Sequence, residues 1–185
     1  MAAPSAQKVI VGLTGGVYRD PTGTASLPTN ATSTLAAEFE QVGYLTDDGL
    51  TLNWFDESTN DIRAWQDNAL VRRVVTEVNS TVTFTALEIN DEVLKAFYGD
   101  ANVSAGTTRV TTEPGVRSPW VIDVRDGTKR KRVVIFDGQV TDRAEIPVQN
   151  GAAMTHGFTL TCYPKADNDQ QLAAVIYDVD TSASS

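Results

Sequence analysis

The chain has 185 residues, of which 41% are hydrophobic and 21% are charged. These values are ordinary for one globular domain, and they exclude a disordered chain or a bundle of membrane-spanning helices. The 15 basic and 24 acidic residues give a net charge of −9. That balance argues against tight binding to nucleic-acid phosphates, which needs clustered Lys and Arg. The N-terminus shows no basic start followed by an apolar run, so we expect no secretory signal, synthesis in a cytoplasm and no membrane partner.

The first 43 residues predict a strand, a long arm and a short helix. Weak alternation over residues 7–13 predicts the strand, and the Gly-, Pro- and Thr-rich stretch 14–32 predicts an irregular N-terminal arm or loop. Thr32, Ser33 or Thr34 is a suitable cap for a helix that ends at Gly43. Apolar residues recur at helical spacing between them.

Four Asp-Gly or Asn-Gly pairs lie between runs rich in Val, Ile, Thr and aromatic residues, and such pairs are strong hairpin signals. Asp48-Gly49 predicts a hairpin of strands 44–46 and 50–54. The other three pairs predict the turns of a four-strand meander, with strands at 120–125, 130–136, 139–147 and 153–163. A further apolar run at 172–177 precedes a Ser-rich end, 180–185, that we expect to be flexible.

Residues 54–72 combine turn-forming and acidic residues with large apolar side chains. Such a loop needs a partner, and two interpretations are equally open: a satellite cluster on its own domain, or an assembly loop that contacts another subunit. The interface candidates are Trp54, Phe55, Ile62, Trp65 and Arg72.

Two strands carry threonines on one face and apolar residues on the other. In 81–87, Val82, Phe84 and Ala86 alternate with threonines, and 153–163 repeats the pattern. The threonines of the polar faces are Thr81, Thr83, Thr85, Thr155, Thr159 and Thr161. Between these strands, Asn90 caps a helix that ends before Gly99. The order of elements predicts one mainly β domain over 1–185, an antiparallel β-sandwich or barrel with one flanking α-helix.

The sequence offers no catalytic, metal or cofactor site, so we expect no enzyme. The single histidine, His156, and the single cysteine, Cys162, lie on the apolar face of a strand and read as core residues. A lone cysteine also excludes an intramolecular disulfide. The basic run 129–132 is either a solvated strand end or a partner for acidic residues of another subunit, and we slightly favour the second interpretation.

Several short motifs together resemble the major tail tube proteins of siphophages, particularly those of actinobacterial phages. They are Leu27-Pro28, Gly43-Tyr44, Asp48-Gly49-Leu50-Thr51, Ala64-Trp65-Gln66, Val71-Arg72, Glu88-Ile89-Asn90 and Tyr98-Gly99, and the pattern covers residues 12–163. The resemblance implies a non-catalytic structural virion protein of the phage tail, assembled in the host cytoplasm.

The resemblance also implies partners. It implies hexameric rings stacked into a tube around a tape measure protein, contacts with tail terminator and distal tail proteins, and genomic DNA that passes through without specific binding. The acidic charge and the threonine faces then predict that those faces line the lumen. The alternatives are a monomeric β-sandwich that binds carbohydrate or a cell surface, and the tube protein of a contractile injection system.

Overall fold

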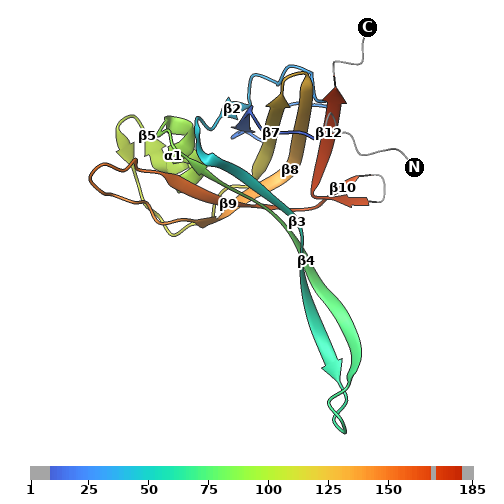
Figure 1. Ribbon diagram of the computed structural model, residues 1–185. Coiled ribbons are helices and arrows are strands. Elements are labelled where there is room, and N and C mark those ends of the chain that lie inside the picture. The colour runs from blue at the N-terminus through green and yellow to red at the C-terminus, as the bar shows by residue number, and fades with distance from the viewer. Residues whose placement is uncertain (1–8, 168–169, 181–185) are drawn as a thin grey trace.

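The computed structural model describes residues 9–167 and 170–180, and it is a mainly antiparallel β-structure with one α-helix (Figure 1). This confirms the predicted fold class. Eight strands form one sheet in the order β2-β1-β7-β8-β9-β4-β3, with β12 also paired to β8. The strands of this sheet are β1 Thr14–Arg19, β2 Glu40–Gln41, β3 Leu45–Arg63, β4 Leu70–Ala86, β7 Ser118–Asp126, β8 Lys129–Arg143, β9 His156–Cys162 and β12 Ala174–Asp180. The remaining elements are α1 Asp91–Tyr98, a 3₁₀ turn Asp100–Asn102, and two small hairpins, β5 Val103–Ser104 with β6 Thr107–Thr108 and β10 Lys165–Asp167 with β11 Gln170–Leu172.

Strand β8 passes from one layer of a sandwich to the other. Its first half pairs with β7 and β12, whereas its second half, from Gly138 onward, pairs with β9. The predicted turn at Asp137-Gly138 is therefore wrong, because the chain continues through it as one strand. A Cβ on Gly138 would lie 2.7 Å from Cδ1 of Trp120, so glycine is required for the indole to pack over this crossing.

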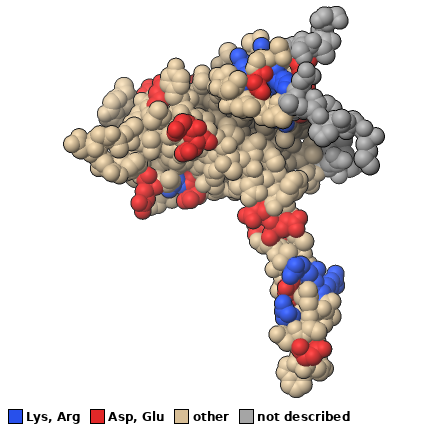
Figure 2. All heavy atoms as spheres, in the orientation of Figure 1, with Lys and Arg blue, Asp and Glu red and all other residues tan. Residues whose placement is uncertain are grey.

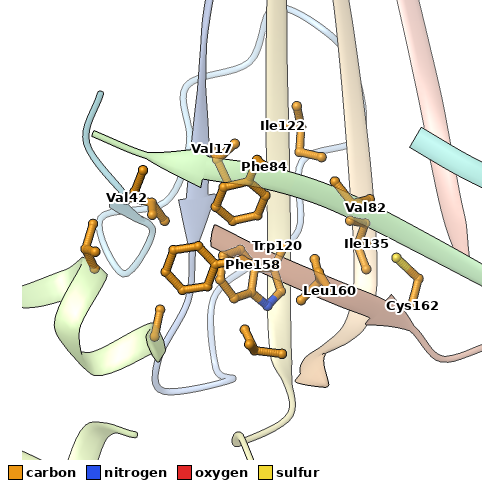
Figure 3. Close-up of a cluster of buried hydrophobic side chains, with 14 of the residues drawn as sticks. Val17, Val42, Val82, Phe84, Trp120, Ile122, Ile135, Phe158, Leu160 and Cys162 are labelled. Carbon is orange, nitrogen blue, oxygen red and sulfur yellow. The ribbon is translucent and has the colours of Figure 1, made fainter. Parts of the chain in front are cut away.

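The core fills the space between the two layers (Figure 3). Val17, Trp120 and Ile122 come from the β1–β7 side, and Phe84 and Phe158 come from β4 and β9. The helix closes one end of this core through Val93, Ala96 and Phe97, and the Asn90 side chain caps it by accepting a hydrogen bond from the Val93 N–H at 2.8 Å. The predicted helix and the apolar faces of β4 and β9 are confirmed.

The N-terminal third differs most from the expectation. The first strand is β1 at Thr14–Arg19, inside the predicted arm 14–32, and 9–13 precede it without strand structure. Residues 20–39 form a loop that packs on the outer face of β7 and β8, where Phe39 is buried against Val121 and Val134. The predicted helix before Gly43 is absent, because Leu35, Ala36 and Phe39 pack on this sheet face whereas Val42 lies in the main core.

Strands β3 and β4 form the longest pair, and they leave the body together as a projecting ribbon (Figure 1). The predicted hairpin turn at Asp48-Gly49 is wrong. Leu45 faces Ala86 and Leu50 faces Phe84, so three extra residues of β3 bulge out there, with Gly49 at φ 70°. The predicted loop 54–72 is mostly strand, and the chain reverses at residues 64–69.

The predicted β7–β8 hairpin is confirmed, with Asp126 facing Lys129 across a two-residue turn. The apolar run 172–177 lies mostly in β12. The predicted flexible end lies outside the described residues, except for Asp180, which ends β12.

Candidate assembly surfaces

The ribbon of β3 and β4 has no support from the rest of the domain beyond its root. Strand β4 pairs with β9 only over Thr81–Ala86, so its residues from Leu70 to Ser80 pair with no strand of the described chain except β3. At about 3.3 Å per residue, the unsupported part extends about 30 Å from the body. We call residues 55–79 the arm. A two-stranded ribbon alone in water is marginally stable, so this arm is suited to being covered by a partner.

The arm exposes large apolar side chains. Trp65 at the tip is 94% exposed and Phe55 at the root is 81% exposed, and Ile62 is also exposed. The arm's valines and Leu70 are exposed or half-buried as well. Among the interface candidates, Trp54 is the exception, because it is half-buried and packs against the subunit's own core. Trp54 therefore contributes to the root of the arm, and its role at an interface stays a prediction.

Charges on the arm are arranged in bands (Figure 2). Acidic residues lie near the root, where Ser58 faces Glu77 and Asp56 faces Asn79. Nearer the tip lie Arg63, Arg72 and Arg73. Arg73 donates two hydrogen bonds to Asp61, at 2.7 and 3.0 Å. Arg72 is exposed and makes no ion pair or hydrogen bond within the described residues. The sequence predicted Arg72 as an interface candidate, and its side chain is available for one.

Four strands present a polar face on the side opposite the core. Cross-strand pairing aligns Asn53, Thr81, Thr161 and Gln139 in one row, and Thr51, Thr83, Thr159 and Asp142 in the next. The lumen candidates Thr81, Thr83, Thr85, Thr159 and Thr161 therefore lie on one face, exposed or half-buried, whereas Thr155 lies in the loop before β9. A shallow hollow of about 250 Å³ on this face is lined by Asp48 and Asp142 and by no Lys or Arg of the described chain.

Lys129, Lys131 and Arg132 of the basic run 129–132 have partners within the subunit, which counts against the favoured interpretation of intersubunit pairing for these three residues. Arg132 is buried and binds the Asp123 carboxylate through two hydrogen bonds, at 2.6 and 2.9 Å. It also donates to the carbonyls of Asn30 and Ser33, which fixes the 20–39 loop on the sheet. Lys131 lies 3.2 Å from Asp178 of β12.

A second buried ionic cluster joins β1 to the helix. Arg19 donates to Glu92 at 2.9 Å and to both carboxylate oxygens of Asp100. Burial raises the pKa of Glu92 to about 7, the nearby Glu40 carboxyl adds to the increase, and Arg19 opposes it. Burial disfavours the charged form of Arg19, but the bonds to Asp100 and Glu92 outweigh that and raise its pKa. No local sequence pattern pointed to this cluster, because Arg19 lies far from Glu92 and Asp100 in the chain.

Two larger grooves lie on the surface. The first, about 670 Å³, lies at the root of the arm between Trp54, Val78 and the β11–β12 segment, and is apolar. We call it the root groove. The second, about 600 Å³, lies between residues 12–16 at the start of β1 and residues 43–50 at the start of β3. We call it the seam. Tyr44, 76% exposed, and Leu13, 69% exposed, lie along the seam.

His156 and Cys162 belong to the core, as the sequence predicted. His156 is buried against Phe97, and burial lowers its pKa. Burial also raises the pKa of the Cys162 thiol to about 12, so the reactive thiolate is disfavoured. Within the described residues, no cluster of three or more His, Cys, Asp and Glu side chains is arranged to hold a metal ion. No helix among them is long and apolar enough to cross a membrane.

These features define a structural β-domain with an arm whose exposed apolar side chains suit contact with another protein. Comparison with known families identifies it further. The family model described as phage tail tube protein matches residues 2–184, so the chain belongs to the phage tail tube protein family. A search of curated proteins finds no match. The family places this structural protein in the phage tail and implies that it assembles with itself and with other tail proteins.

Proposed function

We propose that the chain polymerises as stacked rings, hexameric as in the siphophage proteins it resembles, around a tape measure protein, and that the resulting tube conducts DNA during ejection. The arm carries this proposal. It extends well beyond the body, exposes Trp65 and Phe55, and pairs with no strand of the described residues outside the ribbon itself. Heterologous contacts of one small subunit close into rings when the rotation allows it and extend into filaments when a translation is added.

The direct test removes the apolar contacts of the arm. We expect Trp65→Ser with Ile62→Ser to leave a folded subunit that no longer forms tubes, because exposed side chains contribute little to the subunit and aromatic residues dominate interfaces. Circular dichroism and urea unfolding report the fold, and electron microscopy reports the tubes. Val110→Ser is a matched control, because Val110 is 80% exposed and lies outside the arm. Normal tubes from the double variant would refute an assembly role for the arm.

The polar face is the proposed lumen surface. Its two threonine-containing rows expose hydroxyl and amide groups, its hollow is acidic, and the chain as a whole carries a charge of −9. A wall of this kind repels phosphates weakly within about 8 to 10 Å at physiological salt, and it holds no fixed cation that would bind the duplex.

The lumen assignment is tested in phage particles. Thr83→Lys should leave tube assembly intact and slow DNA ejection at low salt, since each fixed cation adds a salt-dependent attraction to phosphates. Thr24→Lys, on the exposed 20–39 loop, is the control. Unchanged ejection with normal tubes would place Thr83 outside the lumen or show that lumen charge has no effect. Electron microscopy of the same tails also shows whether a contractile sheath surrounds the tube, which separates the siphophage type from a contractile one.

A further inference from the structure

We infer that the seam is the acceptor for the arm tip of a second copy of this chain. The inference rests on the proposed assembly role of the arm and adds the surface that receives it. The tip is defined as residues 61–73, and its centre is the reversal at 64–69, closed by hydrogen bonds between Ala64 and Ala69 and between Asn68 and Ala64.

The seam and the tip lie at opposite ends of the same strand. Leu45 at the start of β3 lines the seam, and Arg63 at its end begins the tip reversal (Figure 1). Nineteen residues of strand separate two points by about 60 Å, less the shortening from bulges. A contact from the tip of one copy to the seam of the next joins two different surfaces, so each copy keeps a free tip or a free seam unless two copies exchange arms reciprocally. Without that exchange the contact is heterologous and continues from copy to copy.

The seam also offers unpaired backbone. Strands β2 and β3 are the two ends of the eight-stranded order, so both are edge strands. Strand β2 pairs only with Tyr18 and Arg19 of β1, which leaves Thr14–Gly16 without a strand neighbour on that side. Five glycines, Gly12, Gly15, Gly16, Gly43 and Gly49, line the groove. At Gly49, where an added Cβ would meet nothing within 4 Å, an incoming segment reaches the main chain directly.

Charge distinguishes the seam from the root groove. The tip carries three arginines against two aspartates, in a chain whose net charge is −9. Asp47 and Asp48 line the seam, are exposed, and form no hydrogen bond or ion pair within the described chain, and no Lys or Arg of that chain lines it. Arg72 at the tip is also exposed and forms no hydrogen bond or ion pair within the described chain. The root groove has no charged residue in its described lining. It also lies at the base of the arm, whose tip points away from it.

The contact thus has an apolar part and a charged part. Trp65 packs with Tyr44 and Leu13, and Arg72 pairs with Asp47. Charges that are unpaired in the free subunit and opposite across the contact set the orientation of docking and speed it. Asp48 borders both the seam and the polar face, so the arm tip ends beside the proposed lumen wall.

Cross-linking tests the acceptor in assembled tubes. Gln66→Cys at the tip is combined with Asp47→Cys at the seam, and tubes are treated with a short bismaleimide. The native Cys162 is buried, so the unsubstituted chain is the background control. We expect a ladder of covalent multimers from this pair and none from Gln66→Cys with Ile176→Cys, which places the second thiol in the root groove. A ladder from the second pair, or from neither pair in normal tubes, would overturn the inference.

A charge exchange tests the same contact without cysteines. Asp47→Lys and Arg72→Glu should each raise the concentration needed for assembly by about tenfold. The two substitutions together should return that concentration to its original value, because opposite charges then meet again at every interface of the polymer. Additive loss in the double variant would overturn the inference even if the cysteine variants fail to assemble. Failure of the acceptor is distinct from failure of the arm. Tubes that form normally with Trp65→Ser and Ile62→Ser refute the proposed function itself.

Discussion

Replacing Glu92 with Gln should remove a pH dependence of folding that the buried ionic cluster creates. The carboxylate is 5% exposed, one oxygen accepts from Arg19 at 2.9 Å, and the other is buried with no hydrogen-bond partner in the described structure. Burial, followed by the neighbouring Glu40, raises its pKa from 4.5 to about 7. The folded state therefore binds more protons than the unfolded state between these two values. The contribution of Glu92 to stability is therefore largest below pH 4.5 and falls as the pH rises to about 7, by about 3 kcal/mol at most.

Urea unfolding at pH 5, 6, 7 and 8, at protein concentrations without tubes, measures this effect. The free energy of unfolding of the unsubstituted protein should fall across the series because Glu92 becomes charged. That of Glu92→Gln should fall less, so the difference between the two proteins should change in favour of the variant by up to about 3 kcal/mol at pH 8. Asp91→Asn is the matched control, because Asp91 is the exposed neighbour in the same helical turn. Parallel pH profiles for Glu92→Gln and the unsubstituted protein would refute the reasoning, since the carboxyl would then have the same pKa in both states.

Three further predictions concern the subunit. Gly138→Ala should lower the free energy of unfolding by about 1 to 3 kcal/mol in urea titrations, because the added Cβ meets the Trp120 ring at 2.7 Å; an unchanged midpoint would show that the ring moves freely. Arg132→Met should cost about 3 to 5 kcal/mol in the same titrations, because it removes both hydrogen bonds that Arg132 donates to the buried Asp123 and leaves Arg125, 3.9 Å away, as its remaining charged neighbour; a loss below about 1 kcal/mol would contradict this. Cys162 should react with a maleimide only in denaturant, as followed by mass spectrometry, since the thiol is 3% exposed with a pKa of about 12; rapid labelling of the folded subunit would show that the structure opens around the C-terminal end of β9.

The elements that the sequence predicted well are those fixed by neighbouring residues. The helix after Asn90 has its cap, its apolar spacing and its terminating glycine within ten residues, and all of them act in the structure. Strand β9 also follows from local alternation, because one face meets the core and the other does not. The Gly127 turn joins strands that are adjacent in the chain, so local turn chemistry was sufficient there.

The Asp-Gly pairs were ambiguous because the same two residue types occur in three different local structures of this chain. Asp126-Gly127 lies at a turn, Asp48-Gly49 forms a bulge within β3, and Asp137-Gly138 lies in the strand that crosses between layers. What separates them is the partner strand, since β3 pairs with β4 and the crossing packs under Trp120. Those partners are distant in sequence, so a local pattern carries no information about them.

The assembly surfaces divide in the same way. The arm's exposed Trp65 and Ile62 were visible as large apolar residues in a polar segment, which has no reason to retain them unless something covers them. The seam was not visible, because it exists only where Gly12–Gly16 and Gly43–Leu50 meet in the fold. Copies with a net charge of −9 repel one another at low salt, and a tip with an excess of arginine docking on Asp47 and Asp48 is a contact in which that repulsion is locally reversed. An acidic subunit thereby keeps its polar face free of cations and still associates, because its attractive charge is confined to the end of an arm.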